Sequence, residues 1–158
     1  MTAETTFEPD QVVRALNDAG VEYVVVGGLA VAAHGVVRAT RDLDLVPAGS
    51  EANMDRLARC LVAVGAEHPI QDQLTGTSLA RPASFKVTTR YGEVQVLNRV
   101  RGVPPFEQLQ RDQITVEIAP GVIAPVCSLP HLRAMKRAAD RPRDHVDLAE
   151  LDVLHGTG

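Results

Sequence analysis

Two aspartates lie one residue apart in an otherwise apolar segment of the chain. Asp42 and Asp44 occur in the stretch RDLDLVP, whose polar and apolar residues alternate as they do in a half-buried β-strand. This alternation places both carboxylates on one face of the strand and the two leucines on the other. Carboxylates in such a place are unfavourable unless a cation compensates them, and Mg²⁺ or Mn²⁺ is a suitable partner. The spacing therefore predicts a divalent metal site at Asp42 and Asp44.

A glycine pair precedes these aspartates. Gly27 and Gly28 follow the apolar run VEYVVV, which predicts a buried strand over 21–26, and precede an alanine-rich segment that predicts a short helix over 29–34. Glycine lets the backbone approach a phosphate closely, and a helix N-terminus directs N–H groups and a positive dipole end at it. A turn at Gly27 and Gly28 is thus predicted to bind phosphates. Alone, a Gly pair is usually a plain turn and an Asp-x-Asp motif a solvated strand edge, but their joint occurrence favours a nucleotide–metal site.

The elements that must position these residues follow an α+β pattern with a mixed sheet. The 158 residues of the chain suit one domain over 1–158, with C-terminal helices over about 128–155 packing on it. Residues 66–82 are expected to form a polar connector, and the last helix is expected to start near Asp144. Further helices are predicted over 8–19, 51–65 (capped by Ser50), 104–110 and 128–140 (capped by Ser128), and strands over 41–47, 84–90, 92–98, 113–118 and 122–127.

The order strand, Gly-Gly, short helix and Arg-x-Thr-x-Asp-x-Asp resembles the nucleotidyltransferase superfamily. The version GGLAVAAHGVVRATRDLDLV, with the tail LRAMKRAADRPRDHVDLAEL, resembles its minimal bacterial branch. That branch includes toxin-type enzymes of toxin–antitoxin systems and small aminoglycoside or lincosamide nucleotidyltransferases. The resemblance implies a nucleotidyltransferase-like mixed sheet flanked by helices. It also implies Mg²⁺- or Mn²⁺-dependent transfer of an NMP from an NTP to the hydroxyl of a protein, a tRNA or a small molecule and, for a toxin-type enzyme, an antitoxin partner.

The resemblance also implies roles for single residues. Asp42 and Asp44 would hold the metal, while Gly27 and Gly28 would hold the phosphates. Arg38 and Thr40 would steady the loop or touch phosphate, although a surface arginine and a strand-starting threonine are equally reasonable interpretations. Lys136 would reach the nucleotide phosphates, or else be one more exposed cation. His34 is expected to be a packed histidine, and the tail residues Arg141, Asp144 and Asp147 are expected to form an interhelix ion pair and a helix cap.

The chain departs from the superfamily pattern at a third carboxylate on a later strand. The matching stretch is YGEVQVLN, in which Gln95 occupies the expected Asp position. A glutamine is neutral and cannot act as a general base. Glu93 lies on the same face one pleat away, so it is a candidate replacement. The alternative is a catalytically degenerate protein of the same fold that binds nucleotide or a partner.

A second departure concerns the glycine pair. Much of the superfamily carries a serine, which adds a hydroxyl contact, at the position that Gly28 occupies in this chain. That contact must then come from another residue or be absent.

Composition excludes several other functions. The net charge of −4 and isoelectric point near 5.7 argue against a broad nucleic-acid surface, although Arg81, Arg90, Arg99 and Arg101 could form a local cationic rim. The polar N-terminus is not a signal peptide, and the apolar residues 24–37 are too few to span a bilayer. We therefore expect a cytoplasmic protein without a membrane role, and Cys60 and Cys127 as buried free thiols.

Overall fold

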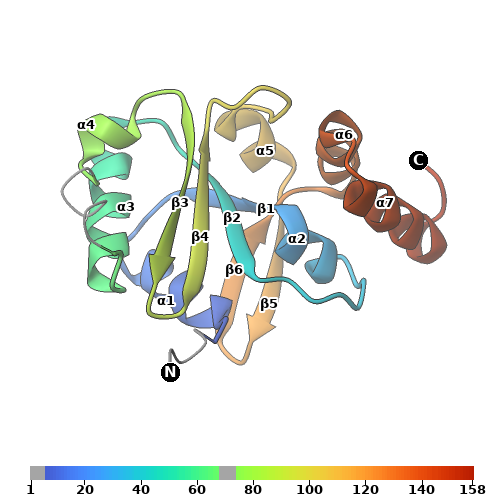
Figure 1. Ribbon diagram of the computed structural model, residues 1–158, viewed down its shortest axis with the longest axis horizontal. Helices are drawn as coiled ribbons and strands as arrows, with labels where there is room; N and C mark the ends of the chain where they lie inside the picture. Colours follow the sequence, from blue (N-terminus) through green and yellow to red (C-terminus); the bar gives the residue numbers. More distant parts are fainter. Residues whose placement is uncertain (1–5, 68–73) are drawn as a thin grey trace.

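The computed structural model describes residues 6–67 and 74–158, and it contains a six-stranded mixed sheet flanked by helices. Figure 1 shows the sheet at the centre, α3 and α4 at one end, and α6 and α7 at the other end beyond α2. The strands are β1 (Tyr23–Val26), β2 (Asp42–Pro47), β3 (Ala83–Thr89), β4 (Gly92–Asn98), β5 (Ile114–Ala119) and β6 (Val122–Val126). The helices are α1 (Pro9–Asp18), α2 (Gly27–Ala33), α3 (Glu51–Ala63), α4 (Gly76–Leu79), α5 (Phe106–Asp112), α6 (Leu129–Ala139) and α7 (Pro142–His155).

The sheet has the strand order β3-β4-β2-β1-β6-β5, in which both predicted hairpins, β3–β4 and β5–β6, occur. β2 runs antiparallel to β1 and parallel to β4. The parallel register pairs Asp42 with Glu93 and Asp44 with Gln95. The α+β class and the mixed sheet predicted from the sequence are therefore confirmed.

Strand alternation separates the core from the polar face. Leu43 and Leu45 of β2 and Val94 and Val96 of β4 are fully buried, whereas the polar residues between them are only partly buried. The buried side chains of α1 and α3, which are spaced as on amphipathic helices, belong to the same apolar cluster. Burying this cluster fixes the register, because a slip of one residue would turn the carboxylates into the core.

The predicted helix caps occur as expected. The Ser50 hydroxyl accepts the backbone N–H of Asn53 at 3.2 Å, and the Ser128 hydroxyl accepts that of His131 at 3.3 Å. Each serine thereby satisfies one of the free N–H groups at the start of its helix. These caps fix where α3 and α6 begin.

Three local predictions are wrong in detail. Gly27 and Gly28 are the first residues of α2 rather than a separate turn, because Gly27 enters the helix with a φ of +72°. The connector expected over 66–82 contains α4, which Thr75 and Ser78 stabilise through a capping box; residues 68–73 lie outside the described part. The last helix begins at Pro142, where proline suits the first helical position, and not at Asp144.

Among the described residues, no helix is both long enough and apolar enough to cross a membrane. Cys60 and Cys127 are buried free thiols, as predicted. Burial raises the pKa of Cys60 to about 11 and that of Cys127 to about 12, so both stay protonated at neutral pH. His34 also lies as expected, with its Nε2 2.8 Å from the carbonyl oxygen of Cys127.

Candidate active site

A cleft of about 910 Å³ opens over the polar face of β2 and β4 and is closed on its far side by α6 and α7. It brings together residues that are far apart in the sequence. Every residue that the sequence analysis singled out for catalysis, metal or nucleotide binding lines it: Gly27, Gly28, Arg38, Thr40, Asp42, Asp44, Glu93 and Lys136.

Asp44 is the most constrained acid in the cleft. Its Oδ1 is buried and makes no hydrogen bond within the described part of the chain. Burial and the neighbouring charge of Asp42 raise the pKa of the Asp44 carboxyl to about 6. A buried carboxylate oxygen without a donor, beside a second carboxylate, is a position where a cation would be favourable.

The start of α2 lies directly against this carboxylate. A Cβ at Gly27 would overlap the Asp44 side chain, and a Cβ at Gly28 would overlap the guanidinium of Arg38. The Oγ1 of Thr40 lies 2.9 Å from the point that a Cβ at Gly28 would occupy, and it donates to the backbone carbonyl of Asp42 at 3.3 Å. A threonine hydroxyl from the next loop therefore lies close to where much of the superfamily carries its serine.

Lys86 of β3 bridges the acids on the exposed side of the cleft. Its Nζ lies 3.2 Å from Oδ2 of Asp42 and 3.6 Å from Oε2 of Glu93. The hydrogen bond to Asp42 raises the pKa of Lys86, so the ammonium stays charged at neutral pH. Glu93 shares a face with Gln95, as strand alternation predicts, and the β2–β4 register places it beside Asp42.

Gln95 lies next to Asp44 in the register, but its side-chain amide turns to the other neighbouring strand. Its Nε2 donates to Oγ of Ser84 on β3 at 3.0 Å. Among the described residues, no group of three or more His, Cys, Asp or Glu side chains is arranged to hold a metal ion. Asp42 and Asp44 are the two neighbouring carboxylates on β2 that line the cleft. Mg²⁺ is often held by one or two carboxylates together with phosphates and water.

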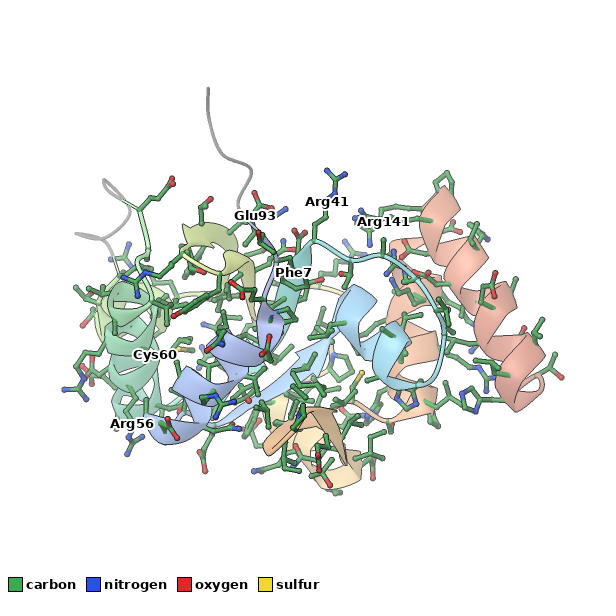
Figure 2. The ribbon with its side chains drawn as sticks, turned by 90° about the horizontal axis from the view of Figure 1, so that it is seen from below. Phe7, Arg41, Arg56, Cys60, Glu93 and Arg141 are labelled. Carbon is green, nitrogen blue, oxygen red and sulfur yellow. The ribbon has the colours of Figure 1, made fainter. Side chains whose placement is uncertain are left out.

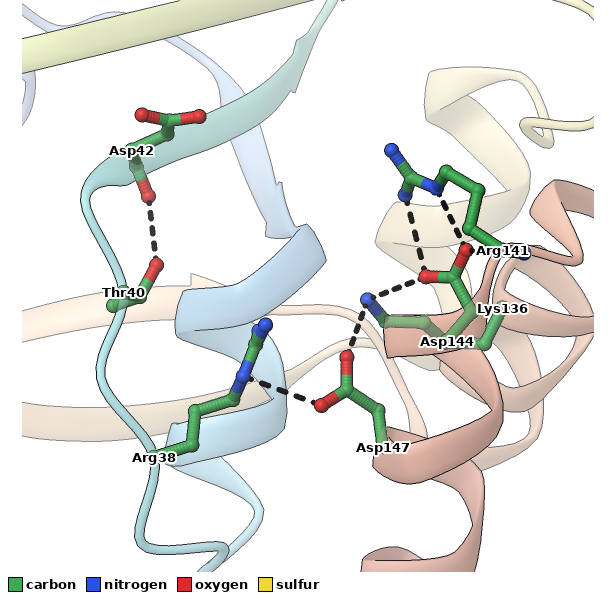
Figure 3. A network of polar contacts seen from close by, with 7 residues as sticks. All are labelled: Arg38, Thr40, Asp42, Lys136, Arg141, Asp144 and Asp147. Atoms are coloured by element: carbon green, nitrogen blue, oxygen red, sulfur yellow. Dashed lines mark hydrogen bonds and ion pairs between the residues drawn. The ribbon is translucent and has the colours of Figure 1, made fainter.

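The wall opposite the aspartates is a buried ion-pair network between α6 and α7 (Figure 3). The Nζ of Lys136 lies 3.1 Å from Oδ1 of Asp144 and 2.9 Å from Oδ2 of Asp147, and all three side chains are buried. Arg141 donates to Asp144 through Nε at 2.7 Å and through its backbone N–H at 3.0 Å. Burial works against ionisation, but the hydrogen bonds from Arg141 and Lys136 hold the pKa of Asp144 below its ordinary value. Arg141 and Asp144 thus form the expected helix-start contact, whereas the interhelix ion pair joins Asp144 and Asp147 to Lys136, which was not expected as their partner.

Arg38 connects this network to the loop that carries the aspartates. Its Nε lies 3.2 Å from Oδ1 of Asp147, while its guanidinium covers Gly28. Figure 3 shows Arg38 and Thr40 on one side of the gap and Lys136 and Asp144 on the other. Lys136 is therefore not a free surface cation, and Arg38 links the two walls of the cleft.

Three further arginines line the cleft, and the sequence analysis assigned none of them a role in nucleotide or metal binding: Arg41, Arg101 and Arg143. None of them forms an ion pair within the described residues. Figure 2 shows Arg41, Arg141 and Glu93 along the same side of the molecule. Of the four arginines proposed as a cationic rim, only Arg101 lines the cleft, whereas Arg90 stacks on Tyr91. The sequence Arg141-Pro142-Arg143, with two arginines at the start of the last helix, could have indicated that Arg143 lies near the site.

No family sequence model matches the chain, and no curated protein sequence matches it significantly. Solved structures do match over nearly its whole length. The lincosamide antibiotic adenylyltransferase LnuA, in its lincomycin-bound form, superposes with a TM-score of 0.64 and 17% identity, covering 98% of this chain and 100% of the other. A Thermotoga maritima protein of inferred nucleotidyltransferase function gives 0.61 and 17%, covering 93% and 95%.

A third similar structure is ANT(2″)-Ia in complex with adenylyl-2″-tobramycin. It gives a TM-score of 0.59 at 13% identity and covers 90% of this chain and 84% of the other. At such identities the likeness establishes the fold and not the reaction. The chain has the nucleotidyltransferase fold, as the resemblance of its motifs implied.

Proposed function

We propose that the protein is a metal-dependent nucleotidyltransferase that moves an NMP unit from an NTP to an acceptor hydroxyl and releases pyrophosphate. The observation that carries this proposal is the buried Oδ1 of Asp44, which has no hydrogen-bond partner among the described residues and lies beside Asp42 in a cleft that Gly27 and Gly28 also line. These donors fit Mg²⁺ or Mn²⁺, which prefer carboxylate oxygens. The nucleotidyltransferase fold makes NTP the natural substrate of such a cleft.

The chain's residues take distinct roles in this proposal. Asp42 and Asp44 hold the divalent ion, which when bound neutralises negative charge on the phosphate oxygens. Gly27 and Gly28 leave room for a triphosphate against the backbone, and Thr40 offers a hydroxyl beside them. Arg38 fixes the loop by its pair with Asp147.

Lys136 has a positioning role in the proposal. Its ammonium is buried between two aspartates, so it sets the orientation of α7 against α6 and offsets part of their negative charge beside the phosphates. Glu93 is the proposed replacement for the missing third carboxylate, because the register places it beside Asp42. Its carboxylate would accept the proton of the acceptor hydroxyl.

The charge of the cleft bears on the acceptor. Seven cationic side chains and only four acidic ones line it, although the whole chain carries a net charge of −4. Tobramycin, which is found as its adenylyl derivative in one similar structure, carries several amines. Such a polycation would be repelled by Arg41, Arg101 and Arg143. We therefore propose a neutral or anionic acceptor, and a protein side chain, a tRNA end and a small hydroxylated molecule all remain open.

Transfer of label from NTP is the direct test. The purified protein is incubated with each of the four α-labelled NTPs, with Mg²⁺ or Mn²⁺, and with fractionated cell extract as the source of acceptor. Metal-dependent label on one fraction, absent from an Asp42→Asn/Asp44→Asn variant, is the expected result. Failure with all four NTPs and both metals would count against the proposal.

A toxin role in a toxin–antitoxin system is a further part of the proposal that rests on the resemblance alone. Expression of the protein should then arrest growth, and co-expression of a protein encoded by a neighbouring gene should restore it. A drug-modifying enzyme would instead raise tolerance to the drug. The two roles are therefore separated by a growth assay of the wild type against the Asp42→Asn/Asp44→Asn variant.

Gln95 favours a second candidate function, a degenerate protein that binds nucleotide without transferring it. Its amide is hydrogen-bonded to Ser84 and supplies no charge to the acids. Calorimetry with Mg²⁺ and ATP separates the two functions. Wild-type binding without transfer, with transfer appearing only in Gln95→Asp, would support the degenerate protein.

A further inference from the structure

Lys86 lies between two acids of the cleft, Asp42 and Glu93. Its Nζ contacts Asp42 at 3.2 Å and Glu93 at 3.6 Å, and it comes from β3, the edge strand on the far side of β4. The register places Lys86 opposite Gln95, so the lysine side chain must reach diagonally past Gln95 to the neighbouring row. A long, flexible side chain is suited to this reach.

Gln95 leaves this space to the lysine. Its amide donates to Ser84 on the edge strand, away from Asp44, although the register pairs Gln95 with Asp44 directly. A carboxylate at position 95 would instead add a second acid to the row of Asp44 and would stand directly opposite Lys86. Position 95 therefore carries no negative charge, and the ammonium of Lys86 adds a positive charge beside Asp42 and Glu93.

The charges support the same conclusion. Asp42, Asp44 and Glu93 are three carboxylates, and the Lys86 ammonium reduces their formal charge to −2 when all are ionised. One divalent cation balances that charge, whereas the charge of a second would have to be balanced by the triphosphate. In two-metal sites the ions lie about 3.5–4 Å apart and share carboxylates, so an ammonium on Asp42 competes for the same oxygen atoms.

We propose that the Lys86 ammonium takes the place of a second divalent ion, so that the site binds one metal ion beside the nucleotide. This inference rests on the proposed function, because it assumes that Asp42 and Asp44 hold a metal ion. Lys86 is then a built-in cation of the catalytic cluster. It keeps Asp42 and Glu93 paired with a positive charge, and it leaves the unpartnered oxygen of Asp44 for the metal.

Counting bound Mn²⁺ tests this inference. Equilibrium dialysis with Mn²⁺ and a saturating non-hydrolysable ATP analogue gives the number of Mn²⁺ ions bound per chain. The Mn²⁺ that is complexed by free analogue in the compartment without protein is subtracted. A second measurement by electron paramagnetic resonance gives the Mn²⁺ affinity without nucleotide. The variants are Lys86→Met and the double variant Lys86→Ala/Gln95→Asp. Lys86 is 44% exposed at its side chain, so both should fold, which thermal unfolding checks.

Arg41→Gln is the matched control, because it removes one positive charge from the same cleft at an exposed residue that forms no ion pair within the described residues. We expect one bound Mn²⁺ in the wild type and in Arg41→Gln, and two in the double variant. Without nucleotide, Lys86→Met should bind Mn²⁺ about tenfold more tightly than the wild type, since the competing charge is removed.

Each other outcome decides a different question. Two ions in the wild type would overturn the inference and leave the proposed function standing. One ion in the wild type with no change of count or affinity in either lysine variant would also overturn it, because Lys86 would then not limit the count. A wild type that binds neither Mn²⁺ nor the analogue would contradict the proposed function itself.

Discussion

The carboxylate of Asp44 occupies the space that a side chain at position 27 would need. Gly27 also has a φ of +72°, in the left-handed region, so an alanine there would meet both backbone strain and overlap with Asp44. We predict that Gly27→Ala lowers the free energy of unfolding by about 3 kcal/mol and abolishes Mg²⁺·ATP binding. Chemical denaturation and calorimetry measure the two effects.

Gly20→Ala is the control for this prediction. Gly20 has nearly the same φ, +71°, but nothing lies within 4 Å of the added Cβ. It should therefore show only the strain of the left-handed backbone, about 1 kcal/mol, and keep its nucleotide affinity. Equal destabilisation of the two variants would mean that the contact between Gly27 and Asp44 is unimportant.

Replacing Asp44 by asparagine should stabilise the metal-free protein. The substitution removes a buried charge that lies beside Asp42 and whose Oδ1 has no hydrogen-bond donor in the part of the chain that the structure describes. We expect Tm to rise by about 2–4 °C at pH 8, which corresponds to about 1 kcal/mol for a chain of this size. The shift of Tm that Mg²⁺·ATP produces in the wild type should disappear.

Asp42→Asn serves as the comparison, since it loses the ion pair with Lys86 and should not gain stability without metal. Scanning calorimetry in the presence of a chelator is the appropriate measurement. An Asp44→Asn protein less stable than the wild type under these conditions would show that the carboxylate is structural.

The hydroxyl of Thr40 should do the work of the serine that is missing at position 28. Its Oγ1 lies near the position that a side chain on Gly28 would take. We predict that Thr40→Ala lowers kcat/KM about tenfold, as expected for loss of one hydrogen bond to a charged group, and that Thr40→Ser restores it. Gly28→Ser in the Thr40→Ala background should not recover the loss, because its Cβ would still overlap the guanidinium of Arg38. An unchanged kcat/KM in Thr40→Ala would assign Thr40 a role in the loop only.

The network between α6 and α7 should govern acid stability. The folded state holds the pKa of Asp144 below its ordinary value of 3.8. Its stabilising contribution is therefore complete at neutral pH and is lost as the pH falls below about 4. We predict that Asp144→Asn lowers the free energy of unfolding by about 3 kcal/mol at pH 7, because the buried ammonium of Lys136 loses one of its two carboxylate partners.

The difference between the wild type and Asp144→Asn should narrow as urea unfolding is repeated from pH 5 down to pH 2.5. Asp140→Asn is the control, because Asp140 is 71% exposed and pairs only with His145 among the residues that the structure describes. It should change stability by about 0.5 kcal/mol at most. A constant difference for Asp144→Asn across this pH range would contradict the assigned cause.

Local patterns were enough to predict the centre of the fold. Alternation in RDLDLVP and GEVQVLN predicted which residues face the core, and the two serines predicted where helices begin. They succeeded because burial and capping depend on residues close in sequence. The joint occurrence of Gly27, Gly28, Asp42 and Asp44 predicted a nucleotide–metal site, and the structure places all four residues in one cleft.

Contacts between distant elements were not predictable in this way. The sequence does not reveal that Lys86 reaches Asp42 across β4, since this depends on the strand order β3-β4-β2. The arginine at position 143 enters the cleft only because α7 packs on α6, and the short helix α4 owes its start to a capping box inside a polar segment. Side chains that act through tertiary placement leave weak local signals.

The most direct test of the central claim is a crystal structure of the protein grown with Mn²⁺ and a non-hydrolysable NTP analogue, with anomalous scattering used to locate the metal. The account predicts an anomalous peak in contact with the carboxylates of Asp42 and Asp44, and a triphosphate lying over Gly27 and Gly28. A nucleotide bound elsewhere, or an ordered triphosphate in this cleft with no metal at the two aspartates, would contradict it.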